Sequence, residues 1–241
     1  MASRLRFALR ILIYCFLLGC VVAKPAVADG AADLELVLAI DASSSVSYDE
    51  FQLQMFGLAA AFRDPAVINA IRSAAPGGVA VSLVQWASAH QQAIAVNWTL
   101  VRDAASAALL ADRIDAAPRL VIGGATAIGS VVSFAIDLLN DNRFVGKRRA
   151  IDVSGDGKAN QGPSPAAARR RALTAGITIN ALAILNEEPA LDAYYDAIVV
   201  GGAGSFTLVA DDYEDFARAI RLKLILEITG ASIARRDLGH G

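Results

Sequence analysis

Three short segments of the sequence contain the oxygen-bearing side chains that hold hard divalent cations in proteins. Asp41–Ser45 has a carboxylate followed by serine hydroxyls, Gly124–Gly129 contains a threonine, and Ser154–Gly157 contains a second aspartate. Two carboxylates, three hydroxyls and water make a six-oxygen shell of the kind that Mg²⁺, Mn²⁺ or Ca²⁺ takes. The candidate metal ligands are therefore Asp41, Ser43, Ser45, Thr126 and Asp156.

Each segment also has a simpler interpretation. Aspartate and serine residues that follow a strand commonly accept hydrogen bonds from nearby backbone N–H groups. Thr126 is also a suitable helix N-cap, and Asp156-Gly157 is typical of a turn. The metal hypothesis depends on all three segments meeting at one place, and hence on the elements that carry them.

The elements predicted around these segments alternate between strands and helices. The apolar run Leu34–Ile40 predicts a buried strand that ends at Asp41. Ser47 and Glu50 have capping-box spacing, which predicts the start of a helix. Further strands are expected at Val79–Trp86, Gln92–Trp98, Ala150–Ser154, Ile177–Leu185 and Phe206–Ala210, the first two of them as an antiparallel hairpin. Further helices are expected at Ala66–Ser73, Arg102–Ala116, Ala127–Asn140, Pro165–Ala175, Leu191–Ile198 and Asp212–Thr229.

This order predicts an α/β domain with a three-layer open sheet, mostly parallel with one antiparallel edge strand, and with helices on both faces. In such sheets ligands bind beyond the carboxyl ends of the strands, near the point where the strand order reverses. Asp41 and Asp156 both follow predicted strands. We therefore expect the three segments to meet at that edge of the sheet.

Asp152 is an unusual residue within a predicted strand. It lies between Ile151 and Val153, where a central parallel strand should be apolar on both faces. An ionised carboxylate in that position needs partners. One hypothesis is that Asp152 accepts hydrogen bonds from the loop that carries Ser43 and Ser45. The alternative is that the strand ends there and the side chain reaches solvent.

The segments LVLAIDASSSVS, GGATAIG and IDVSGDGKANQG resemble a von Willebrand factor A domain with a complete metal-ion-dependent adhesion site. The resemblance extends over Leu34–Ile228, and the segments are most similar to a family of secreted bacterial A-like proteins of uncharacterised function. It implies that a divalent cation, Mg²⁺ or Mn²⁺ with Ca²⁺ as an alternative, is bound by Asp41, Ser43, Ser45, Thr126 and Asp156. It also implies that a carboxylate from a partner protein fills the last coordination position.

The N-terminal segment has the pattern of a secretory signal peptide. Residues 1–28 carry basic residues and no acid, with the apolar run Ile11–Ala23 followed by the small residues of Ala26-Val27-Ala28. We expect cleavage near Ala28, a periplasmic or secreted location and no membrane span in the mature chain. The alternatives are an uncleaved anchor and a lipoprotein attached through Cys20. The expected organisation is a signal peptide at 1–28, one von Willebrand factor A-like domain at 29–230 and a loose tail at 231–241.

The charge and the cysteine content of the mature chain exclude several classes of function. Without residues 1–28 the chain has 18 basic and 24 acidic residues, and both cysteines are lost. The net charge of −6 argues against nucleic-acid binding. The loss of cysteine excludes disulfides, thiol nucleophiles and Cys-ligated metals from the mature chain.

The sequence favours binding over catalysis. Only His90 and His240 are available as histidine bases, and no G-x-S-x-G motif occurs. We expect a protein that is not an enzyme and that uses its cation to capture an acidic residue of a protein partner. The alternatives are a metal-assisted hydrolase built on Asp41, and a structural domain that has a metal site but no partner.

Overall fold

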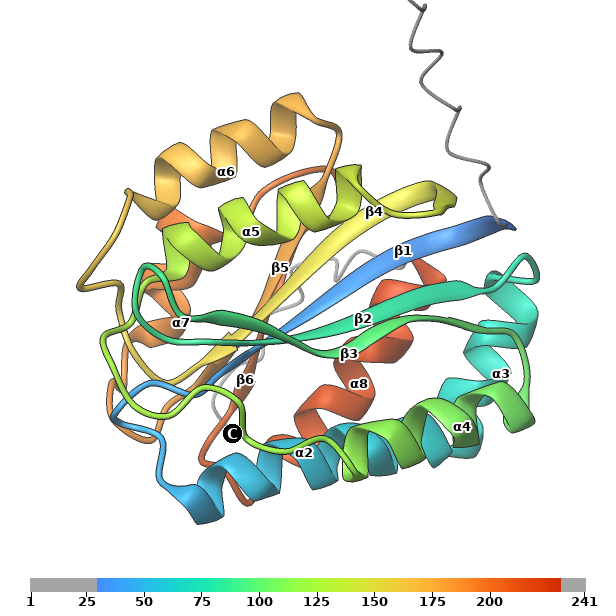
Figure 1. The fold of residues 1–241 in the computed structure, drawn as a ribbon, viewed down its shortest axis with the longest axis horizontal. Helices are drawn as coiled ribbons and strands as arrows, with labels where there is room; N and C mark the ends of the chain where they lie inside the picture. Colours follow the sequence, from blue (N-terminus) through green and yellow to red (C-terminus); the bar gives the residue numbers. More distant parts are fainter. Residues whose placement is uncertain (1–29, 231–241) are drawn as a thin grey trace, which may run out of the picture.

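The computed structural model describes residues 30–230, which form one six-stranded sheet with helices on both faces (Figure 1). The strands are β1 (Gly30–Asp41), β2 (Val79–Trp86), β3 (Gln92–Val101), β4 (Phe144–Gly155), β5 (Thr178–Ile184) and β6 (Thr207–Ala210). Their order is β3-β2-β1-β4-β5-β6, and every neighbouring pair is parallel except β2 and β3. The expected fold class, including the antiparallel edge strand, is confirmed.

The helices form the two outer layers. One layer, below the sheet in Figure 1, consists of α2 (Tyr48–Arg63), α3 (Pro65–Ala74), α4 (Ala104–Asp115) and α8 (Phe216–Thr229). The other consists of α5 (Ile128–Asn140), α6 (Pro165–Thr174), the short α7 (Leu191–Tyr194) and the π-helical turn η1 (Tyr195–Val199). Two separate apolar cores therefore lie on the two faces of the sheet.

The central strand β1 is buried on both faces, as its unbroken apolar run predicts. Leu36 and Leu38 belong to the core beneath α2 and α8, whereas Val37 and Ala39 belong to the core beneath α5. Because both faces are packed, the strand is a rigid support for Asp41 at its end.

The helix that follows β1 begins with the predicted capping box. Oγ of Ser47 accepts a hydrogen bond from N of Glu50 at 3.2 Å, and Oε2 of Glu50 accepts one from N of Ser47 at 2.8 Å. The two side chains satisfy backbone donors that a helix start would leave free. They fix the start of α2 directly after the serine segment.

Several elements differ in length from their sequence predictions. β4 begins at Phe144 rather than Ala150, because its first residues pair with β1 although Lys147 and Arg148 are exposed and break the apolar pattern. α8 begins at Phe216 rather than Asp212, because the preceding residues form a turn. The predicted signal peptide at 1–28 and the tail at 231–241 lie outside the described residues.

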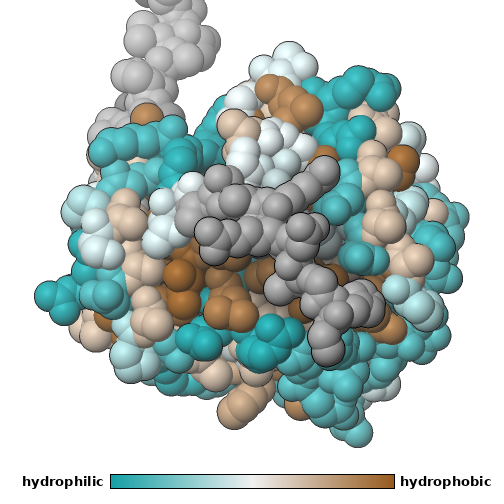
Figure 2. Space-filling view, turned by 180° about the vertical axis from the view of Figure 1, so that it is seen from behind, coloured by the Kyte–Doolittle hydropathy of each residue, from teal (hydrophilic) through white to brown (hydrophobic). Residues whose placement is uncertain are grey.

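The surface is mostly polar. Seen from the side opposite to Figure 1, hydrophilic residues predominate at the periphery and apolar residues gather near the centre (Figure 2). Within residues 30–230, no helix has the length and apolar character needed to cross a bilayer. The most exposed large apolar side chain of this region, Ile122, lies in the loop between α4 and α5.

Candidate metal centre

The three predicted segments meet at the carboxyl edge of the sheet, at the left of Figure 1. β1 and β4 are parallel neighbours, and Ile40 pairs with Ser154, so Asp41 and Asp156 leave the sheet side by side. From β1 the chain continues to β2 on one side over one face of the sheet, and it later reaches β4 on the other side of β1 from α5 on the opposite face. The strand order therefore reverses between β1 and β4. Open α/β sheets bind ligands at such a point.

Four of the five predicted ligands form a connected group. Oδ1 of Asp41 accepts a hydrogen bond from N of Ser43 at 2.7 Å. Oγ of Ser43 lies 3.3 Å from Oγ of Ser45, which donates to Oδ1 of Asp156 at 2.8 Å. Residues from two strand ends, 111 positions apart in the chain, therefore converge on one point.

Thr126 lies at the rim of this group. Its Oγ1 is 3.7 Å from the position that a Cβ on Gly157 would take, next to Asp156. Its backbone is held by Asn160, whose Oδ1 accepts from N of Thr126 at 2.9 Å and whose N donates to O of Thr126 at 3.0 Å. The N-cap of α5 is Ala127, with no side-chain cap. The alternative role of Thr126 as an N-cap is therefore wrong.

One carboxylate oxygen of Asp41 accepts a hydrogen bond from the nearby backbone, but the other does not. Its Oδ2 is buried and has no hydrogen-bond partner among the described residues. A Cβ added to Gly155 would stand 2.8 Å from this oxygen and 2.9 Å from the Tyr195 hydroxyl. A glycine is thus required beside the orphaned oxygen, which needs a partner that the protein itself does not provide.

The electrostatics of the pair also favour a cation. Burial and, after it, the neighbouring Asp156 raise the pKa of Asp41 to about 7, against the opposing effects of Ser43 and Arg119. Burial likewise raises the pKa of Asp156, opposed by hydrogen bonds from Ser45 and Tyr213. Two buried carboxylates cannot both ionise cheaply without a positive charge between them. A divalent cation would supply that charge, so the residues present fit one.

The donor set is rich in hydroxyls rather than acids. No group of three or more His, Cys, Asp or Glu side chains that would hold a metal occurs within residues 30–230. A cation here would depend on the two aspartates together with serine and threonine oxygens.

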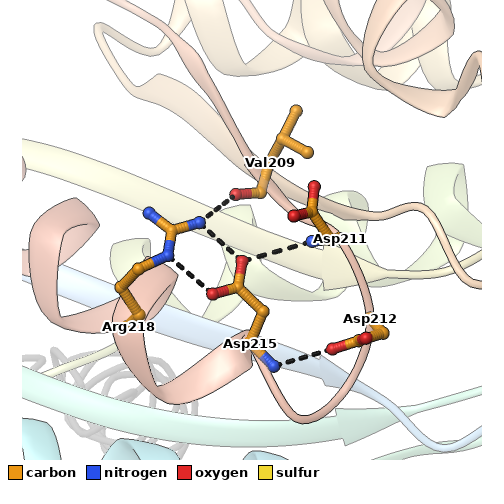
Figure 3. Close-up of polar contacts among 5 residues, drawn as sticks. All are labelled: Val209, Asp211, Asp212, Asp215 and Arg218. Atoms are coloured by element: carbon orange, nitrogen blue, oxygen red, sulfur yellow. Dashed lines mark hydrogen bonds and ion pairs between the residues drawn. The ribbon is translucent and has the colours of Figure 1, made fainter.

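Tyr213 is a contributor that the sequence analysis missed. Its hydroxyl donates to Oδ2 of Asp156 at 3.0 Å, and its ring is buried. The turn before α8 holds it there, and Figure 3 shows the contacts of that turn. Arg218 binds both carboxylate oxygens of Asp215, whose N donates to Asp212 at 2.8 Å. The sequence predicted that Tyr213 lies in the helix Asp212–Thr229, and nothing in it indicated this contact.

Arg119 is a second residue that the sequence analysis missed. Its guanidinium donates to the backbone oxygens of Ala42 and Val46 at 3.0 and 2.9 Å, and to that of Ser47 at 3.0 Å. Its Nε donates to O of Val121 at 3.1 Å. One side chain from the α4–α5 loop therefore fixes the whole β1–α2 loop, and its charge lowers the pKa of Asp41.

The hypothesis that Asp152 supports the serine loop is wrong, and so is its solvent-exposed alternative. Asp152 is buried, and its Oδ1 lies 2.7 Å from Nζ of Lys223 on α8. The same ammonium lies 2.9 Å from Oε1 of Glu227, which also accepts from Nδ2 of Asn180 at 2.8 Å. Asp152 thus joins α8 to the sheet, because its side chain points to the α8 face.

Comparison with known proteins identifies the family. The family described as "Protein of unknown function (DUF1194)" matches residues 31–232. The chain belongs to this family. No curated protein matches the sequence.

Solved structures share the fold of this DUF1194 member at low identity. Proximal thread matrix protein 1 from the mussel byssus is 17% identical, with a TM-score of 0.58 over 83% of this chain and 49% of that chain. The von Willebrand factor type A protein from Catenulispora acidiphila is 18% identical, with a TM-score of 0.54 over 82% and 43%. The chain thus spans about half the length of these two proteins.

A third similar structure covers a single domain. The von Willebrand factor domain of the type V pili tip protein Mfa5 from Porphyromonas gingivalis is 13% identical, with a TM-score of 0.54 over 85% of this chain and 99% of that chain. Another crystal structure of the mussel protein has a zinc-occupied MIDAS motif, at 17% identity, a TM-score of 0.57 and coverage of 83% and 46%. At these identities the likeness shows that residues 30–230 have a von Willebrand factor A fold.

Proposed function

We propose that this protein is a metal-dependent protein-binding domain. In the proposal a divalent cation, Mg²⁺ or Mn²⁺, is held by Asp41, Ser43, Ser45, Thr126 and Asp156, and captures an acidic residue of a partner protein. The observation that carries it is the buried, unpartnered Oδ2 of Asp41 beside a second buried carboxylate. The zinc-occupied MIDAS motif of the mussel protein supports metal binding on this fold.

The chemistry of the donor set explains why the partner is acidic. Two carboxylates neutralise a divalent cation, and three hydroxyls add no further negative charge. The cation would stay electrophilic towards an external oxygen ligand. The carboxylate of a Glu or Asp side chain is the protein group that satisfies it best.

We propose binding rather than catalysis because Asp41 and Asp156, the carboxylates that could transfer protons here, would be occupied by the cation. Residues 30–230 offer no other suitable proton-transfer group at the site. The one histidine among residues 30–230, His90, lies exposed in the link between β2 and β3. The phenol groups of Tyr195 and Tyr213 lie next to the two aspartates. Burial raises the pKa of each phenol well above its ordinary value. Neither tyrosine would exchange protons readily near neutral pH. A periplasmic or secreted location completes the proposal and rests on the signal-peptide pattern of residues 1–28.

The test is a calorimetric titration of Mg²⁺, Mn²⁺ and Ca²⁺ into the purified protein and into the variants Thr126→Ala and Asp156→Asn. We expect saturable binding at one site that is lost in Asp156→Asn and weakened at least tenfold in Thr126→Ala. Thr174→Ala, on the exposed end of α6, is the matched control and should bind as the wild type does. Circular dichroism shows that each variant is folded. Absence of binding in the wild type, or equal binding in all variants, would overturn the proposal.

A further inference from the structure

Two strongly exposed apolar side chains lie beside the candidate metal centre, in the loop between α4 and α5. Ile122 is 76% exposed and Leu120 is 50% exposed. The same loop is bonded to the serine segment: N of Ser44 donates to O of Gly124 at 3.0 Å, and N of Gly124 donates to Oγ of Ser44 at 2.8 Å. Ile122 therefore stands two residues from a direct contact with the segment that carries the proposed metal-binding hydroxyls.

Polar contacts and one buried side chain fix this loop. Oε1 of Gln85 accepts from N of Leu120 at 2.6 Å, and Nε2 of Gln85 donates to O of Pro118 at 2.8 Å. Arg119 joins the loop to the start of α2, and the side chain of Val121 is buried between its exposed neighbours. The backbone is thus held so that Leu120 and Ile122 face solvent. Exposed apolar groups on a fixed support are typical of an interaction surface.

A third exposed apolar side chain, Tyr48, lies at the start of α2, which Arg119 joins to the loop. Tyr48 is 65% exposed and is the first residue of α2. The preceding residue, Ser47, accepts a hydrogen bond from Arg119. Tyr48, Leu120 and Ile122 form what we call the apolar rim of the site.

The opposite side of the site is acidic. The strands β5 and β6 lie beyond β4, on the side away from β2, and their carboxyl ends lead to Glu187, Asp211 and Asp212. Glu187 and Asp211 are exposed. In Figure 3 only the backbone N–H of Asp211 takes part in the contacts drawn, and its carboxylate does not. Lys158 also lies on this side and is paired with Glu188. The border of the site therefore changes from apolar at Leu120 and Ile122, next to β2, to negative near β5 and β6. Tyr48 lies between the two sides, because Glu50 on the same helix accepts a hydrogen bond from Asn186, the neighbour of Glu187.

We propose that the partner presents its metal-binding carboxylate on a segment that has a large apolar side chain on one side and a basic side chain on the other. The apolar side chain packs on the apolar rim, and the basic one faces Glu187 and Asp211. This inference rests on the proposed function, because the cation fixes where the carboxylate lies. Charge complementarity and continuity with the metal site select this partner, since an acidic surface without apolar groups would be repelled by the β5–β6 side.

A displayed library of random twelve-residue peptides tests the inference. Peptides are selected on the Mn²⁺-loaded wild-type protein and eluted with chelator. We expect enrichment of Asp or Glu with Leu, Ile, Phe or Met on one side and Lys or Arg on the other. A synthetic copy of an enriched peptide should bind about tenfold more weakly to the double variant Leu120→Ser/Ile122→Ser, since two apolar contacts are lost. Val145→Ser removes an apolar residue whose exposed fraction lies between those of Leu120 and Ile122, at the far end of β4, and this variant should bind the peptide normally.

The outcomes separate this inference from the proposed function. Selection of acidic peptides without apolar neighbours, bound equally by the double variant, would overturn the inference and leave the metal-dependent capture of acids intact. Selection of no metal-dependent acidic peptide would overturn both. The apolar rim could instead be covered by a second copy of the chain, and light scattering tests this by measuring the oligomeric state. A dimer that dissociates in the double variant would show that the rim joins two copies, which would also overturn the inference.

Discussion

The hydroxyl of Tyr213 donates to Oδ2 of Asp156 across 57 positions of sequence, and the two atoms lie 3.0 Å apart. Asp156 therefore receives one hydrogen bond from Ser45 at Oδ1 and another from Tyr213 at Oδ2. Both donors favour its ionised form and thus its proposed role as a metal ligand. The turn before α8 is part of the site although it supplies none of the five predicted ligands.

Tyr213→Phe removes the donor and keeps the ring. We expect the free energy of unfolding of the metal-free protein to fall by about 1 kcal/mol, because a buried acceptor loses its hydrogen bond. Metal affinity should fall about tenfold, because Asp156 is no longer oriented. Denaturation and calorimetry measure the two effects. Tyr48→Phe, at an exposed position, is the control for both, and an unchanged affinity in Tyr213→Phe would contradict the positioning role.

The stability of the metal-free protein should fall as the pH rises from about 4 to about 7. The ordinary pKa of an aspartate side chain is 3.8, whereas that of Asp41 in the folded protein is about 7. The folded state therefore binds more protons than the unfolded state across this window. Stability then decreases with pH until the folded group has ionised. Thermal unfolding in chelator at pH 4, 5, 6 and 7 measures the slope. Asp41→Asn should make it shallower, and the part that remains comes from Asp152 and Asp156, whose pKa values burial also raises. An equal slope in that variant would mean that other groups cause it.

Metal affinity should change in the opposite direction. A cation binds the ionised form of Asp41, so binding must release a proton wherever the pH is below about 7. We expect the affinity for Mn²⁺ to rise as the pH rises towards 7 and to level off above it. Titrations in buffers of different ionisation enthalpy count the released protons. Proton release that is the same at pH 5.5 and pH 8.5 would refute the assignment to Asp41.

Gly155→Ala should be costly, whereas Gly157→Ala in the same loop should not. A Cβ at residue 155 would meet Oδ2 of Asp41 at 2.8 Å, but one at residue 157 would meet Thr126 only at 3.7 Å, an ordinary contact. We expect Gly155→Ala to lower the free energy of unfolding by about 1–3 kcal/mol, as overpacking does in a filled site. Chemical denaturation compares the pair, and equal stability of the two variants would contradict the packing seen around Asp41.

Lys223→Met should be strongly destabilising because it leaves Asp152 and Glu227 buried without their counter-ion. The expected loss is about 3–5 kcal/mol. It should be larger at pH 8 than at pH 5, because protonation relieves the unpaired carboxylates at the lower pH. Arg221→Met on the same helix is the control. It breaks only a 4.0 Å surface pair, and should cost about 0–1 kcal/mol. Denaturation at both pH values makes the comparison.

Local patterns in the sequence were sufficient for most of the fold. The unbroken apolar run of the central strand, the capping box at Ser47 and the hairpin link after Trp86 depend on residues close together in the chain, and all three are present. The prediction was weakest at element ends. The first half of β4 is held by pairing with β1. The basic run Lys147–Arg149, of which Lys147 and Arg148 are exposed, gives no sign of this pairing in the sequence.

The sequence by itself determined the types and order of the candidate ligands, because hard oxygen donors after strands are recognisable from their neighbours. Only the tertiary structure decided what surrounds them. Arg119 reaches Ala42 across 77 positions, Tyr213 reaches Asp156 across 57, and Asp152 faces Lys223 rather than the serine loop. Such partners depend on the path of the chain and on which face of the sheet a side chain occupies. No local pattern encodes that path, since it is fixed only when both cores pack.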